Sequence, residues 1–118
     1  MNPELPLQVI CSANQRSLGA VLLQQNERGE RRCLNLASTV LDGVHETRPA
    51  IEKELLGVAF ALHSFHRWLT GRSFILHVNN RALAAILERE LEPRSRSWAM
   101  WLDLISEYDF EVQHHELN

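Results

Sequence analysis

The segment HVNNRALAAIL, residues 77–87, places polar side chains where an α/β enzyme could carry out chemistry. A strand-like run over residues 73–78 ends in Asn79 and Asn80, and a short helix is predicted to follow. The carboxyl end of a strand is where open α/β sheets bind their ligands. The two residues offered here are neutral amides. They could contribute to a weak single-metal site, but the favoured interpretation is that Asn79 caps the helix that starts at Arg81.

Histidine spacing offers a second candidate site. His63 and His66 lie three residues apart in a predicted helix, and this spacing can bind a metal ion. No third ligand is apparent, so two surface histidines are the favoured interpretation. His114 and His115 lie near the C-terminus, and we assign them no function. The sequence therefore predicts no bound metal ion and no cofactor.

Composition is typical of a soluble globular domain. Of the 118 residues, 45% are hydrophobic and 23% are charged, and this length suits one domain. No apolar run approaches the ~18 residues that are needed to cross a bilayer. The net charge of −3 gives no sign of a nucleic-acid binder. Eleven of the twelve basic residues are arginine, a residue that suits phosphate groups and protein interfaces alike.

The ends of the chain and its cysteines indicate the cellular setting. The opening MNPELPLQVI lacks the basic region and the cleavage site of a signal peptide. Both ends resemble arbitrary boundaries, so we expect a single domain over residues 1–118 of a larger chain, with about six N-terminal and four C-terminal residues frayed. Cys11 and Cys33 fall on predicted strands and are expected to be buried free thiols in a reducing compartment. We therefore expect an intracellular location, in the cytoplasm or the nucleus.

Hydrophobic periodicity predicts the elements that must position these side chains. Three strands on short turns come first, then a helix, a strand, two helices and a last strand. The expected ranges are 7–11, 18–24 and 32–37 for the first strands, 50–69 for the long helix, 73–78 for the fourth strand, 82–90 and 95–107 for the later helices, and 108–113 for the last strand. Pro49 suits the first helical position. A strand reached through a helical crossover is expected to be parallel to its neighbour, which gives a mixed sheet.

The large apolar residues indicate which helix faces are buried. An apolar stripe with helical spacing is expected along the long helix, at Ile51, Leu55, Val58, Leu62 and Phe65. The three tryptophans are expected to fill the core or to cover the boundary between helices and sheet, although one exposed tryptophan could mark an interface; they are Trp68, Trp98 and Trp101.

Four segments carry a resemblance to a known family. They are LGAVLLQ (18–24), AIEKELLGVAFALHSFHRWLTGRSF (50–74), NNRAL (79–83) and SWAMWLDLISEYDFEV (97–112). Together they resemble the ribonuclease H domain of Ty3/gypsy-type retrotransposon reverse transcriptases, over about residues 8–114. The resemblance implies an α/β ribonuclease H-like fold, in which helices pack on a five-stranded mixed sheet with the element order βββαβααβ.

The resemblance also implies where catalytic metal ligands would lie. Active relatives hold two divalent ions, usually Mg²⁺, about 3.5–4 Å apart between carboxylates. The position of the first family aspartate is Ser12, the helix glutamate is Glu54, and the aspartate after the fourth strand is Asn79. A fourth acidic ligand would lie beyond Asn118. Neutral side chains replace carboxylates poorly at such ions, so the resemblance implies a catalytically inactive copy.

The leading hypothesis is therefore an inactive ribonuclease H-like domain derived from a retrotransposon pol polyprotein. We expect a host gene to have retained it as a structural or interaction module in a larger protein, with protein partners or neighbouring domains of the same polypeptide. An active or weakly active ribonuclease H that cleaves RNA in RNA–DNA hybrids is one alternative. A non-catalytic nucleic-acid-binding module is the other, based on arginines expected around one end of the helices: Arg67, Arg72, Arg81, Arg94 and Arg96.

Overall fold

The chain forms one five-stranded mixed sheet. The structure is a computed structural model, and it describes residues 5–88 and 95–115. The strands are β1 (Leu7–Ala13), β2 (Ser17–Gln25), β3 (Arg31–Val40), β4 (Ser73–Val78) and β5 (Asp109–His114). They lie in the order β3-β2-β1-β4-β5. β1 pairs with β2 and β2 with β3 in antiparallel fashion, whereas β4 is parallel to both β1 and β5. This arrangement confirms the predicted mixed sheet.

Short polar turns connect the antiparallel strands. Between β1 and β2, the Asn14 side chain accepts hydrogen bonds from the backbone N–H groups of Arg16 and Ser17. Between β2 and β3, Asn26 accepts in the same way from Glu30, and Gly29 adopts a positive φ of 84°. Glycine adopts such a conformation without steric cost, so the turn signal in NERGE has a direct structural cause.

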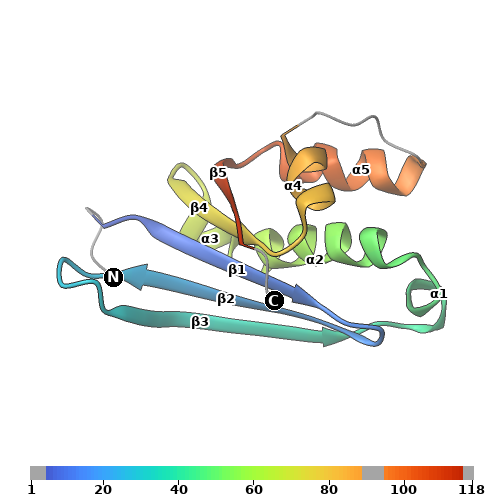
Figure 1. Cartoon of the computed structure of the whole chain (residues 1–118), viewed down its shortest axis with the longest axis horizontal. Helices are drawn as coiled ribbons and strands as arrows, with labels where there is room; N and C mark the ends of the chain where they lie inside the picture. The colour runs from blue at the N-terminus through green and yellow to red at the C-terminus, as the bar shows by residue number, and fades with distance from the viewer. Residues whose placement is uncertain (1–4, 89–94, 116–118) are drawn as a thin grey trace.

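The helices lie on one side of the strands, as Figure 1 shows. They are α1 (Gly43–Glu46), α2 (Ala50–Ser64), α3 (His66–Leu69), α4 (Arg81–Leu87) and α5 (Arg96–Ile105). α2 contacts β1, β2 and α5, while α4 contacts β4 and β5. No helix in the described ranges is long and apolar enough to cross a membrane.

Several predicted boundaries were wrong. The long helix does not run to Leu69, because the backbone at Phe65 (φ −103°, ψ 18°) separates α2 from α3. The connector after β3 contains α1, which Asp42 caps by accepting a hydrogen bond from the N–H of His45. Pro49 is the residue that precedes α2 and not its first helical residue.

Strand and helix ends differ from the expected ones in a similar way. β3 extends to Val40, three residues beyond the expected end. The last helix ends at Ile105 and β5 begins at Asp109, one residue later than expected. Residues 89 and 90, expected in the fourth helix, lie outside the described residues, as do both chain ends at 1–4 and 116–118.

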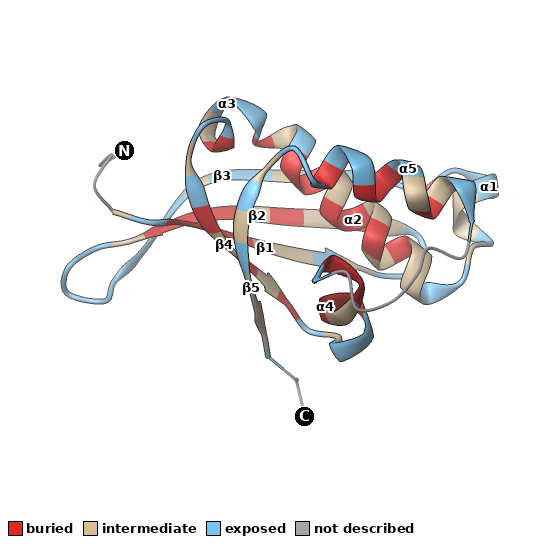
Figure 2. Cartoon of the chain, turned by 90° about the horizontal axis from the view of Figure 1, so that it is seen from above, coloured by how far each residue is buried: buried red, intermediate tan, exposed pale blue. Residues whose placement is uncertain are grey.

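The core lies between α2 and the sheet (Figure 2). The apolar stripe of α2 is buried as predicted at Leu55, Val58 and Leu62, and Phe65 at its end is fully buried. Ile51 is only half-buried, because it lies in the first turn. Trp98 and Trp101 of α5 are buried in the same core, while Trp68 is half-buried against its margin.

Candidate functional site

Ser12, Glu54 and Asn79 line one small cavity of about 10 Å³ at the carboxyl ends of the central strands β1 and β4. Parallel pairing of β1 with β4 sets Ile10 opposite His77, so Ser12 and Asn79 follow at the same distance beyond the last paired residues. Glu54 reaches the cavity from α2. This helix lies close to β1, since a Cβ atom at Gly57 would be 3.9 Å from the Ser12 carbonyl oxygen.

The Glu54 carboxylate is partly removed from water. Its Oε2 atom is buried and has no hydrogen-bond partner among the described residues. Burial raises the pKa of the Glu54 carboxyl above its ordinary value, and a hydrogen bond with the Asn80 side chain lowers that pKa in part. The folded protein therefore holds an acidic group that is poorly solvated and has one neutral partner.

Asn80, and not Asn79, caps the helix that follows the strand, so this part of the sequence prediction was wrong. The Asn80 side-chain oxygen accepts a hydrogen bond of 3.2 Å from the backbone N–H of Leu83, at the start of α4. The Asn80 backbone is extended (φ −130°, ψ 122°), as is usual for a residue that caps a helix N-terminus. Asn79 is exposed and lines the cavity. Asn80 thus connects the α4 terminus to Glu54.

We predict that Asn80→Ala destabilises the protein more than Asn79→Ala. Loss of the cap costs about 1 kcal/mol in unfolding free energy, and removal of the Glu54 partner adds to that cost. Asn79→Ala is expected to cost less than about 0.5 kcal/mol because the side chain is exposed. Urea unfolding followed by circular dichroism measures both values, and equal losses in the two variants would contradict the assignment.

Comparison with known proteins identifies the family. The model of the RNase H-like domain found in reverse transcriptase matches residues 2–108. The chain belongs to this family. It is 28% identical over 102 residues to the retrovirus-related Pol polyprotein from transposon 297 of Drosophila melanogaster. That match covers 86% of this RNase H-like domain but only 9% of the polyprotein.

Solved structures agree with the fold of this RNase H-like domain. A foamy viral protease-reverse transcriptase in complex with dsDNA matches 100% of the chain with a TM-score of 0.78 and 16% identity, over 25% of that protein's length. RNase H1 from Halobacterium salinarum matches 95% of the chain and 85% of its own, with a TM-score of 0.63 and 8% identity. At these identities, the likeness shows a common fold.

A pair of divalent ions, which the family resemblance implies, does not fit the residues of the cavity. Mg²⁺ requires oxygen ligands in near-octahedral geometry, and charged oxygens bind it far better than neutral ones. Glu54 supplies the carboxylate here, Ser12 a hydroxyl and Asn79 an amide. Across residues 5–88 and 95–115, no three histidine, cysteine, aspartate or glutamate side chains are grouped so that they could hold a metal ion.

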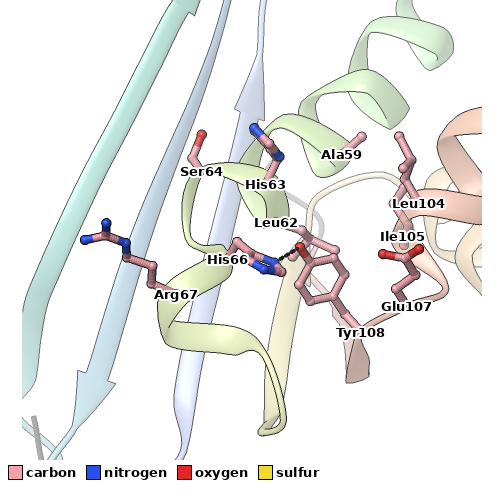
Figure 3. A pocket seen from close by; sticks show the side chains of 10 residues that line it. All are labelled: Ala59, Leu62, His63, Ser64, His66, Arg67, Leu104, Ile105, Glu107 and Tyr108. Atoms are coloured by element: carbon pink, nitrogen blue, oxygen red, sulfur yellow. Dashed lines mark hydrogen bonds between the residues drawn. The ribbon is translucent and has the colours of Figure 1, made fainter.

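The histidine pair His63 and His66 does not line the cavity; His63 lies in α2 and His66 begins α3. His63 and His66 are both exposed and line a groove of about 550 Å³ between the end of α2, α3 and the end of α5. Figure 3 shows the His66 ring directed at the hydroxyl of Tyr108, with Nδ1 and the hydroxyl oxygen 2.8 Å apart. No sequence pattern indicated this contact with Tyr108, because His66 and Tyr108 are 42 positions apart and meet only in the folded chain.

His115, to which the sequence assigned no role, makes specific contacts in the structure. Its backbone N–H donates to the Val78 carbonyl, and its ring stacks on His77 with the ring centres 5.2 Å apart. Burial lowers the pKa of His77, and the nearby His115 and Arg31 lower it further. The expected fraying of the C-terminus therefore does not include His115.

Two further expectations were wrong, one on the burial of the cysteines and one on the clustering of the arginines. Both cysteines are free thiols, but Cys11 is half-buried and Cys33 is exposed; desolvation raises the pKa of the Cys11 thiol to about 12. Cys33 is exposed because β3 is an edge strand. Arg72 precedes the first residue of β4 and Arg81 follows its end, so these two arginines lie at opposite ends of a strand and not together. Arg94 lies outside the described residues.

Proposed function

We propose that this RNase H-like domain does not cleave RNA and acts as a structural or interaction module within a longer polypeptide. The observation that carries the proposal is the lining of the cavity, where Glu54 is the only carboxylate among the described lining residues. Two-metal hydrolysis places carboxylates around both ions, so one carboxylate with a hydroxyl and an amide gives too few charged ligands. The hydrogen bond from Asn80 to Glu54 supports the proposal further, since it gives the carboxylate one neutral partner in place of a cation.

A retrotransposon origin explains the fold without requiring its chemistry. The match to a transposon Pol polyprotein supports descent from a retroelement. On this proposal the element was of the Ty3/gypsy type, and a host gene retained the domain. Because the chain corresponds to 9% of that polyprotein, the simplest partners are neighbouring domains of the same polypeptide. Large apolar residues that remain exposed support such contacts, with Leu36 68% and Val40 79% exposed on β3, and Met100 55% and Leu104 50% exposed on α5.

A cleavage assay tests the proposal. The domain is incubated with a labelled RNA–DNA hybrid in Mg²⁺ and, separately, in Mn²⁺, alongside an active ribonuclease H1. We expect the hybrid to stay intact in both metals while the control enzyme degrades it, and we expect Glu54→Gln to leave this result unchanged. Cleavage that Glu54→Gln abolishes would overturn the proposal, because Glu54 would then be a working metal ligand.

A further inference from the structure

A second pocket, of about 370 Å³, adjoins the small cavity and shares Ser12 and Asn79 with it. Its other polar lining groups are Arg31, His77 and His115, and Ile10 contributes apolar surface. No lining residue in the described chain is acidic. Where the family resemblance places two aspartates, this pocket therefore has a hydroxyl and an amide, beside the Arg31 guanidinium and two histidine rings.

Arg31 supplies the permanent charge of this pocket. Its guanidinium makes no salt bridge among the described residues, whose ion pairs are Arg16 with Glu46 and Arg48 with Glu52. The charge is close enough to His77 to lower the pKa of that ring. An arginine that is not neutralised by a carboxylate can offer its planar set of N–H donors to an oxyanion.

A chain of hydrogen bonds assigns the protonation of His77. The Gly29 carbonyl can only accept, so Gln25 presents its Nε2 to it (3.2 Å) and its Oε1 to Gln8 Nε2 (3.1 Å). Gln8 Oε1 must then accept from His77 Nε2, at 2.8 Å. His77 Nδ1 accepts in turn from His115 Nε2, at 3.1 Å. This network assigns His77 as a neutral ring and keeps both of its nitrogens occupied.

The hydrogen bonds of this network involve only the Nε2 atom of His115 and not its Nδ1 atom. His115 lines the pocket, so this atom is available for a further hydrogen bond there. The pocket therefore presents one permanent cation, Arg31, with the Ser12 hydroxyl and the Asn79 amide as neutral donors.

We propose that this pocket binds the phosphate group of a small phosphorylated molecule directly, without a metal ion. The inference rests on the proposed function, since aspartates at positions 12 and 79 would repel a phosphate in the absence of cations. A phosphate offers acceptor oxygens and negative charge to these donors, while Ile10 can contact an apolar part of the ligand. The volume lies within the range of ~300–1,000 Å³ that small-molecule sites occupy.

The test titrates the domain with inorganic phosphate, with AMP and with adenosine, at constant ionic strength and pH, and follows binding by calorimetry and amide chemical shifts. We expect saturable binding of phosphate and AMP, no binding of adenosine, and shifts centred on Ser12, Asn79 and His115. Arg31→Gln should weaken AMP binding by about tenfold, as expected for loss of a charge-assisted hydrogen bond. Arg32→Gln is the matched control, because Arg32 is the exposed neighbour on β3 but does not line the pocket, and it should leave the affinity unchanged.

Three outcomes would overturn the inference. The first is that neither phosphate nor AMP saturates the domain at roughly 10 mM, where even weak specific binding is detectable. The second is an equal loss of AMP affinity in Arg31→Gln and Arg32→Gln, and the third is binding of a 5′-phosphorylated RNA oligonucleotide without binding of AMP. The first two outcomes in a domain that cleaves no hybrid would overturn the phosphate site alone. Cleavage of the hybrid would instead overturn the proposed function, so the two failures are distinguishable.

Discussion

Replacing both Ser12 and Asn79 with aspartate is expected to create a protein that Mn²⁺ stabilises. The two new carboxylates would join Glu54 around a cavity of about 10 Å³, where like charges raise one another's pKa and disfavour the folded state. We expect the metal-free double variant to lose about 2 kcal/mol in unfolding free energy, from roughly one to two pKa units of mutual repulsion. At a hundredfold excess of Mn²⁺ over its dissociation constant, binding should return about 2.7 kcal/mol. Thermal unfolding with and without Mn²⁺ measures both effects.

Three controls make this prediction specific. The wild-type domain should show no rise in melting temperature with Mn²⁺, since its single carboxylate is partnered by Asn80. Adding Glu54→Gln to the double variant should remove the Mn²⁺ response, because a ligand is lost. Ser12→Asn with Asn79→Gln changes the same positions without adding charge and should not respond either. If Mn²⁺ stabilised the wild-type domain as strongly as the double variant, the claim that the wild-type cavity has too few charged ligands for a metal ion would be wrong.

The order of elements could be predicted because it depends on local patterns. Alternating apolar residues in β2 and the stripe Leu55, Val58, Leu62 on α2 each report a face that must be buried, whatever the element packs against. The parallel pairing of β4 with β1 followed from the intervening helix, since crossover connections join parallel strands. The end of α2 was not visible in the same way. Phe65 continues the apolar spacing, so periodicity alone cannot tell a continuous helix from one that is interrupted at that residue.

The candidate site was only partly predictable. The family resemblance identified Ser12, Glu54 and Asn79, and the register of β1 and β4 explains why these positions meet. The role of Asn80 depends on two contacts at once, with Leu83 in its own helix and with Glu54 in another. Sequence spacing reports the first type of contact but not the second. For this reason the two adjacent asparagines could not be told apart, although their local sequence suits either as a cap.

The chain of hydrogen bonds across the sheet shows the same limit more clearly. Gln8, Gln25 and His77 come from three different strands, and their side chains meet only because β1 lies between β2 and β4. A buried glutamine, 5% exposed at Gln8, is a signal of partner groups once its burial is known, since buried amides are nearly always hydrogen-bonded. The sequence does not reveal that burial, because glutamine is usually a surface residue.

Phe65→Ala is expected to be the most destabilising single change discussed for this domain. The ring is 0% exposed and lies at the junction of α2 and α3, where it packs in the main core. Removing a buried phenylalanine ring typically costs about 3–5 kcal/mol, because both the transfer energy of the ring and contacts around the remaining cavity are lost. Domains of this size are stable by about 5–15 kcal/mol, so a large part of the stability would be lost. Chemical unfolding monitored by circular dichroism gives the change in free energy.

Phe60→Ala, within α2, provides the matched control for Phe65, which directly follows that helix. Phe60 is only half-buried, so the same loss of a ring should cost less than half as much as Phe65→Ala. The pair also tests the helix interruption, because the backbone N–H of Phe65 already bonds to the carbonyls of Ala61 and His63 and alanine can keep these bonds. Loss of stability with unchanged helical signal at low denaturant would assign the effect to packing. Equal destabilisation by the two variants would contradict the prediction, because burial in the core would then not explain the contribution of Phe65 to stability.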